Sequence, residues 1–152
     1  LNCPGQIVVS GAAEKIVSAC ETAKNAGAKR AIPLTVAGAY HSPLMQSAKA
    51  GLADAFSKVT INSHKLPVFS NVTGQMHVSD ETIAETMVDQ VTSPVKWEAC
   101  IRAMIAHGVT RFIELGPGSA LTGFMRRIDR EVEILNVSDI DSLTKTAEVL
   151  NA

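Results

Sequence analysis

One histidine of the chain lies where general-base chemistry is possible. His41 stands directly before Ser42 and Pro43, which are the N-cap and first-turn residues typical of a helix start. The free N–H groups at a helix start carry a partial positive charge and favour a neutral imidazole, the form that accepts a proton. A histidine that merely precedes a helix in a loop gives the same pattern, and the spacing alone favours that reading.

A second stretch, residues 89–97, could supply a partner for such a base. It joins the end of one predicted helix to the start of another, and the last carbonyls of a helix have no intrahelical donor. One of these carbonyls could accept the Nδ1 hydrogen of a nearby histidine, the orienting role that a carboxylate has in a Ser-His-Asp triad. A plain helix–helix connection with its carbonyls in water is the simpler reading.

The glycines, cysteines and other histidines show no spacing typical of a phosphate, nucleophile or metal site. The glycine turn at residues 116–118 could hold an anion, but it lacks the Lys-Ser/Thr of a phosphate loop, and Gly123 is misplaced for a dinucleotide fingerprint. A tight turn between a strand and a helix explains it better. Cys3 and His41 have the order of a Cys-His pair, yet Cys3 does not precede a helix start that would activate its thiol. The four histidines and three cysteines share no metal-ligand spacing, so no metal site is expected.

Composition excludes several classes of protein. The 152 residues are 46% hydrophobic and 19% charged with a net charge of −1, so no basic field recruits nucleic acid or an anionic membrane. We find no signal peptide and no apolar run long enough to span a bilayer. An odd number of unpaired cysteines favours a reducing compartment, and we expect a cytoplasmic location. The chain begins on Leu1 without an initiator Met, as a fragment would.

The periodicity predicts strands alternating with helices. The expected strands are at residues 6–10, 30–36, 66–70, 109–115 and 132–137. The expected helices are at residues 12–26, after Ser42, after Ser79, after the Ser93-Pro94 pair, from about 119 to 128, and after Asp141 as a cap. This order predicts an α/β fold with a parallel sheet covered by helices on both faces. A change of pattern at residues 36–39 divides a small β-α-β unit, residues 1–36, from a larger α/β part, residues 37–152.

Five stretches together carry a resemblance that no single one supports. In order, they are residues 2–11, 27–34, 38–45, 90–97 and 114–123. Along nearly its whole length the chain resembles the C-terminal half of the malonyl-CoA:acyl carrier protein transacylase family, which includes the acyltransferase domains of polyketide synthases. The resemblance implies that residues 37–152 belong to a hydrolase-like parallel sheet and residues 1–36 to the second half of a small ferredoxin-like subdomain.

The same resemblance implies a chemistry. In that family a serine attacks the malonyl thioester of coenzyme A, a histidine takes the proton, and the pantetheine thiol of acyl carrier protein resolves the malonyl-serine in a ping-pong reaction. The family histidine falls on His41, the residue whose backbone carbonyl orients it falls on Gln90, and an active-site asparagine falls on Asn2. Tyr40 occupies the position where malonyl-selective members carry a bulky aromatic residue. Coenzyme A enters as part of the substrate, and no cofactor is implied.

The departure from the family pattern is large. The chain contains no Gly-x-Ser-x-Gly nucleophile motif and no counterpart of the family's N-terminal Gln or malonate-binding Arg. The resemblance implies that these residues lie in an N-terminal half. The implied partners of this chain are then that N-terminal half, malonyl-CoA and acyl carrier protein, and the chain alone is expected to be inactive. Fatty acid biosynthesis is the expected pathway. The alternatives are a polyketide synthase acyltransferase domain and a non-catalytic fragment that binds a partner.

Overall fold

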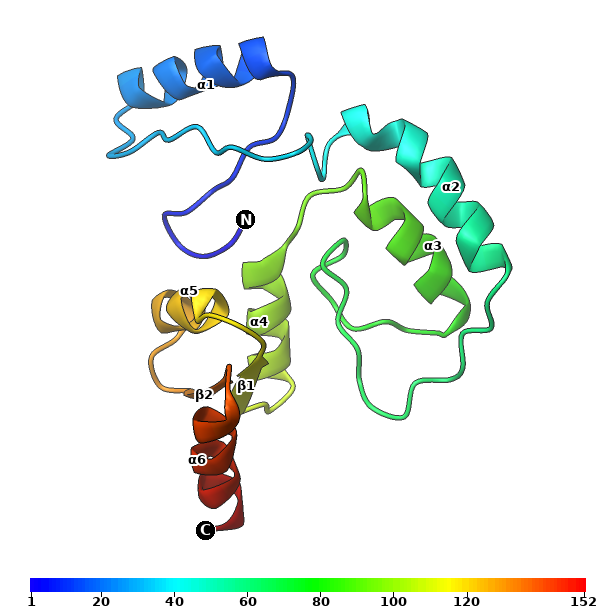
Figure 1. Cartoon of the computed structure of the whole chain (residues 1–152), viewed down its shortest axis with the longest axis vertical. Coiled ribbons are helices and arrows are strands. Elements are labelled where there is room, and N and C mark those ends of the chain that lie inside the picture. Colours follow the sequence, from blue (N-terminus) through cyan, green and yellow to red (C-terminus); the bar gives the residue numbers. More distant parts are fainter. The chain divides into compact units, whose positions relative to one another are not determined.

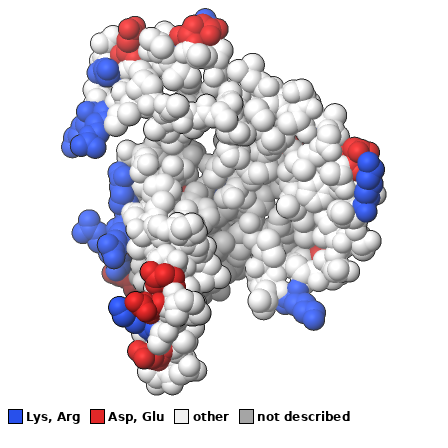
Figure 2. All heavy atoms as spheres, in the orientation of Figure 1, with Lys and Arg blue, Asp and Glu red and all other residues white. Residues whose placement is uncertain are grey.

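The computed structural model describes the backbone of residues 1–152 and every side chain except that of Glu81. Its chain forms two compact units, each described by itself: a central unit, Val8–Val95, and a C-terminal unit made of Leu1–Ile7 and Lys96–Ala152 (Figure 1). Most of the face shown in Figure 2 carries no charged side chain. No helix of the described chain is long and apolar enough to cross a membrane.

The C-terminal unit contains a small parallel sheet. Strands β1 (Arg111–Leu115) and β2 (Glu133–Val137) pair in parallel over their whole lengths. Helix α5 (Ala120–Ile128) forms the crossover between them, as parallel pairing requires. Helix α6 (Ile140–Asn151) packs against β2, and α5 packs against β2 and against α4 (Trp97–Ala106). The mixed α/β class and the parallel pairing are therefore confirmed.

The core of the C-terminal unit joins its two chain segments. Its buried side chains are Cys3, Ile101, Met125 and Ile128. Cys3 comes from the first segment of the unit, whereas the other three come from α4 and α5. Burying apolar side chains from both segments holds the N-terminal residues against these helices.

The central unit is built from three helices. Helix α1 (Ala13–Asn25) confirms the helix expected at 12–26, and α3 (Glu81–Gln90) confirms the helix expected after Ser79. Helix α2 (Gln46–Ser57) follows a 3₁₀ turn, Pro43–Met45. The Ser42 hydroxyl accepts a hydrogen bond from the Leu44 N–H at 3.3 Å, so the Ser-Pro start signal is confirmed. Helix α2 packs against α3.

Three predicted strands are wrong. Residues 7–10 and 30–36 form no strand, and the stretch 66–70 contributes only an isolated bridge between Phe69 and Met76. Ile7 and Ile32 are 68% and 63% exposed. Their β-branched composition favours an extended backbone, but a strand exists only where a neighbour accepts and donates its ladder hydrogen bonds. No such neighbour lies beside these segments within the described residues.

Two predicted helix starts are also wrong. The helix expected after the Ser93-Pro94 pair is present as α4, but the pair itself does not begin it. Lys96 (φ −102°, ψ 52°) lies outside the helical region, and α4 begins after it, at Trp97. Asp139, not Asp141, caps α6. Asp139 has an extended backbone (φ −156°), and its carboxylate accepts the Ser142 N–H at 2.8 Å, whereas Asp141 already lies in the first helical turn.

Candidate functional site

The backbone at His41 is held in an unusual conformation. Its φ is +61°, and among the described residues it is the one non-glycine residue with a positive φ. The His41 N–H donates to the Val91 carbonyl at 3.2 Å, and the Ser42 hydroxyl donates to the Ala39 carbonyl at 2.6 Å. A left-handed backbone costs an L-residue energy, and such residues are concentrated at functional sites. The surrounding hydrogen bonds therefore hold His41 in a strained backbone conformation, which fixes the position of its imidazole.

Gln90 supplies the partner of the imidazole through its main chain. It is the last residue of α3, and His41 Nδ1 lies 2.9 Å from its carbonyl oxygen. A carbonyl oxygen only accepts, so Nδ1 carries the hydrogen and Nε2 keeps its lone pair. The Gln90 side-chain nitrogen lies 3.3 Å from the same Nδ1, but it cannot donate to a nitrogen that is itself a donor. This tautomer is the one that a general base requires.

An ion pair braces the two helices that carry these residues. Lys49 on α2 lies 2.5 Å from the carboxylate of Asp89, the residue before Gln90 on α3. Both side chains are partly exposed, so the pair contributes little to overall stability. It joins the helix that follows His41 to the helix end that orients it. No local pattern in the sequence indicates this contact, because it links positions 40 residues apart.

Tyr40 and Asn2 lie in different surroundings. Tyr40 precedes His41, is 47% exposed, and places its ring 3.7 Å from where a Cβ on Gly38 would be. Asn2 belongs to the C-terminal unit, where its N–H donates to the Gln6 carbonyl at 3.3 Å. The structure thus brings His41 and Gln90 together, and Tyr40 is the chain neighbour of His41. Asn2 occupies a separate turn.

The glycine turn after β1 has an internal carboxylate that sequence reasoning missed. Glu114 accepts the N–H groups of Leu121 and Thr122 at 3.0 and 2.9 Å and the Thr122 hydroxyl at 2.6 Å. Desolvation raises the pKa of Glu114, but these hydrogen bonds outweigh it and hold the pKa below its usual value. The donors that an anion would use at the start of α5 are therefore already engaged, and the turn is structural.

The remaining sulfur and metal candidates are also located. Cys3 and Cys100 are buried, and burial raises the pKa of the Cys100 thiol. Among the side chains that the structure describes, no three of His, Cys, Asp or Glu gather as a metal-ligand set.

The geometry at His41 defines a class of chemistry. The imidazole is exposed, its Nδ1 is fixed by a main-chain carbonyl, and its Nε2 is available to a nucleophile. A base held in this way can take a proton from a hydroxyl or thiol as it attacks an acyl group, which is the first step of acyl transfer.

Comparison with known proteins agrees with that class. Residues 1–146 match the acyl transferase domain family, and the chain belongs to this family. The malonyl CoA-acyl carrier protein transacylase of Bacillus subtilis is 42% identical over 150 residues, which are 99% of this chain and 47% of that protein. The chain therefore spans about half the length of this relative.

Solved structures of relatives have the same fold. The crystal structure of malonyl CoA-acyl carrier protein transacylase from Clostridium perfringens matches with a TM-score of 0.95 and 42% identity, covering 99% of this chain and 48% of that one. A malonyl-transacylase in complex with a type II PKS acyl-carrier protein matches with a TM-score of 0.94 and 35% identity, covering 98% and 48% of the two chains. The resemblance seen in the sequence is therefore confirmed.

Proposed function

We propose that this chain is the C-terminal half of a malonyl-CoA:acyl carrier protein transacylase in which His41 is the general base. The 2.9 Å contact between His41 Nδ1 and the Gln90 carbonyl carries the proposal. It gives the imidazole the tautomer that accepts a proton at Nε2. The carbonyl takes the place that a carboxylate holds in a Ser-His-Asp triad.

The nucleophile in this proposal is a serine of the N-terminal half. His41 Nε2 takes the serine proton as the oxygen attacks the thioester carbonyl of malonyl-CoA, and backbone N–H groups of that half stabilise the oxyanion. The C–S bond then breaks, and the coenzyme A thiolate leaves with the proton from His41. The pantetheine thiol of acyl carrier protein next gives its proton to His41 and attacks the malonyl-serine, and the serine oxygen leaves with that proton.

Two further residues would contact the acyl group. Tyr40, partly exposed beside His41, would fill the room that an α-methyl group needs and so favour malonyl over methylmalonyl. Filling that room is worth about 1–3 kcal/mol of discrimination. Asn2 would contribute its side-chain amide to the substrate. Within the part of the chain that the structure describes, that amide makes no hydrogen bond.

The exposed apolar side chains of the chain would be buried in the full-length protein. Residues 1–36 would form half of a ferredoxin-like subdomain, and residues 37–152 part of a hydrolase-like sheet with helices on both faces. Ile7, Val9, Ile32 and Leu34 are each more than half exposed, and strands from the N-terminal half would cover them.

Fatty acid biosynthesis in the cytoplasm is the proposed setting, with coenzyme A present only as substrate. A role in polyketide synthesis is the second candidate, because one similar malonyl-transacylase is solved with a type II PKS acyl-carrier protein. Transfer to fatty-acid and to polyketide carrier proteins, compared side by side, separates the two.

Reconstitution tests the proposal. The chain is co-expressed with the N-terminal half of its Bacillus subtilis relative, and transfer from malonyl-CoA to holo acyl carrier protein is followed. We expect transfer by the reconstituted protein, none by residues 1–152 alone, and a loss of about 10³-fold or more with His41→Ala. His77→Ala is the matched control and keeps the rate. Near wild-type rates with His41→Ala would refute its role as base, and turnover by the chain alone would mean that it holds its own nucleophile.

A further inference from the structure

The Asn2 backbone belongs to a tight turn at the start of the chain. The Gln6 N–H donates to the Cys3 carbonyl at 2.9 Å, which closes a four-residue β-turn, Cys3-Pro4-Gly5-Gln6. Pro4 holds the second position and Gly5, with φ +74°, the third, which is the pattern of a type II turn. The Asn2 N–H extends the pairing to the Gln6 carbonyl at 3.3 Å. The placement of Asn2 therefore depends on this turn.

The turn has a carbonyl that its own hydrogen bonds do not satisfy. The Pro4 carbonyl belongs to the central peptide of the turn, and Arg127 Nη2 donates to it at 2.7 Å. Arg127 Nη1 also donates to the Gln6 side-chain oxygen at 3.2 Å. The guanidinium holds donors on separate nitrogens in one rigid plane and so fits two acceptors of fixed separation, whereas an ammonium carries its donors on a single nitrogen. One residue of α5 thus bridges both sides of the turn.

The guanidinium lies close to the glycine of the turn. A Cβ on Gly5 would lie 3.2 Å from Arg127 Nη2, a tight contact, in addition to the strain of a side chain at φ +74°. The turn and Arg127 therefore fit each other from both sides.

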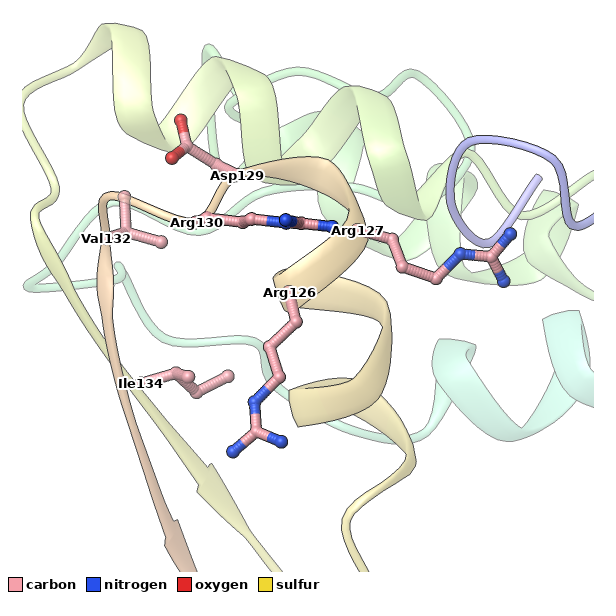
Figure 3. Close-up of a pocket in the computed structure, with 6 residues that line it drawn as sticks. All are labelled: Arg126, Arg127, Asp129, Arg130, Val132 and Ile134. Carbon is pink, nitrogen blue, oxygen red and sulfur yellow. The ribbon is translucent and has the colours of Figure 1, made fainter.

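The side chain of the neighbouring Arg126 points in a different direction from that of Arg127. In Figure 3 the Arg127 side chain runs from α5 toward the N-terminal turn, whereas that of Arg126 points into the hollow beside Ile134. Arg126 has the same charge and lies one residue away on the same helix, but within the described residues the hydrogen bonds to the turn come from Arg127. Charge alone does not explain the Arg127 contacts.

We propose that Arg127 is a positioning residue that fixes the Asn2–Gln6 turn and so aims the Asn2 amide at the acyl substrate. The proposal rests on the substrate contact proposed for Asn2. Cys3, 3% exposed in the core, anchors one end of the turn, and Arg127 holds the rest. Loss of Arg127 therefore loosens the turn without removing its anchor.

Hydrogen exchange of the 152-residue chain tests the positioning without any need for activity. In Arg127→Ala we expect the Gln6 amide to exchange about tenfold faster, because charge-assisted hydrogen bonds are lost, with Arg126→Ala within twofold of wild type. Gly5→Ala strains the turn itself at φ +74° as well as crowding Arg127 Nη2, so it is the positive control and should also speed Gln6 exchange. Unchanged Gln6 exchange in Arg127→Ala would overturn the proposal.

Kinetics of the reconstituted enzyme tests the link to substrate. A displaced Asn2 weakens the ground state and the transition state alike, so Arg127→Ala should raise the KM for malonyl-CoA about tenfold and keep kcat within about twofold. Arg127→Lys, which keeps the charge but loses the planar fork of donors, should recover part of the loss, and Arg126→Ala should change neither constant. A lower kcat with unchanged KM would indicate only a smaller folded fraction and would refute positioning. Failure of the unmodified reconstituted protein to transfer malonyl would refute the proposed function, while the exchange result would stand by itself.

Discussion

The positive φ of His41 makes a prediction that separates backbone strain from side-chain chemistry. His41→Gly and His41→Ala both remove the imidazole and its 2.9 Å contact with the Gln90 carbonyl, so that loss is equal in the two variants. They differ in the backbone, because alanine keeps a Cβ at φ +61° and glycine does not. The difference in their stability therefore measures the strain at this residue.

The magnitude follows from two opposing terms. A left-handed backbone costs an L-residue about 1–2 kcal/mol, and glycine loses about 0.5–1 kcal/mol more chain entropy on folding than alanine. The free energy of unfolding of the glycine variant should then exceed that of the alanine variant by about 0.75 kcal/mol, the difference between the midpoints of the two ranges, and by at most about 1.5 kcal/mol. For a chain of this size that difference raises the midpoint of thermal unfolding by about 1–4 °C.

Thermal and urea unfolding of the 152-residue chain, followed by circular dichroism, provides the assay. Ala53→Gly in α2 is the control, since an exposed glycine in a helix interior should cost about 1 kcal/mol. The sign of the glycine effect therefore reverses between the two positions. A glycine variant at residue 41 that is less stable than the alanine variant would refute the strained backbone.

Two further predictions concern the C-terminal unit. Because the pKa of Glu114 is lowered in the folded chain, its contribution to stability is complete above the ordinary unfolded pKa and is lost as the pH falls through the folded pKa. Glu114→Gln should therefore lose less stability on acidification than the wild type does, as measured by urea midpoints from about pH 7 to pH 3. Asp139→Ala should lower the free energy of unfolding by about 1 kcal/mol and Asp141→Ala by only a few tenths, as measured by thermal unfolding. Equal losses would contradict the assignment of Asp139 as the cap.

The sequence predicted best what short-range chemistry decides. Ser42 and Pro43 mark a helix start because their hydroxyl and fixed φ act on the next few residues, and the structure has that start. Residues 109–115 and 132–137 were predicted as strands, and β1 and β2 form there because each has the other as a hydrogen-bonding partner. Residues 7–10 and 30–36 have similar composition and no partner, so the same signal failed.

The candidate site shows the same division. The local pattern made the helix-end carbonyl at residues 89–97 and the histidine before Ser42 candidates but favoured plainer readings of both. The family resemblance singled out Gln90 and His41, and the structure joins them. The φ of His41 and the contacts of Arg127 with a turn more than 120 residues away come from tertiary packing. No local pattern encodes them, because each depends on which distant segment lies alongside.

The exposed apolar segments also bear on how such a protein is made. Residues 7–10 combine β-branched side chains with no charge, which is the composition of segments that associate when they emerge unpaired. Residues 30–36 are also apolar and exposed, although Pro33 opposes such association. A ribosome delivers a chain from its N-terminus, so in the full-length protein proposed here the covering half is complete before these segments appear. The order of synthesis would then prevent these segments from associating with other chains, and a C-terminal half made alone would lack that protection.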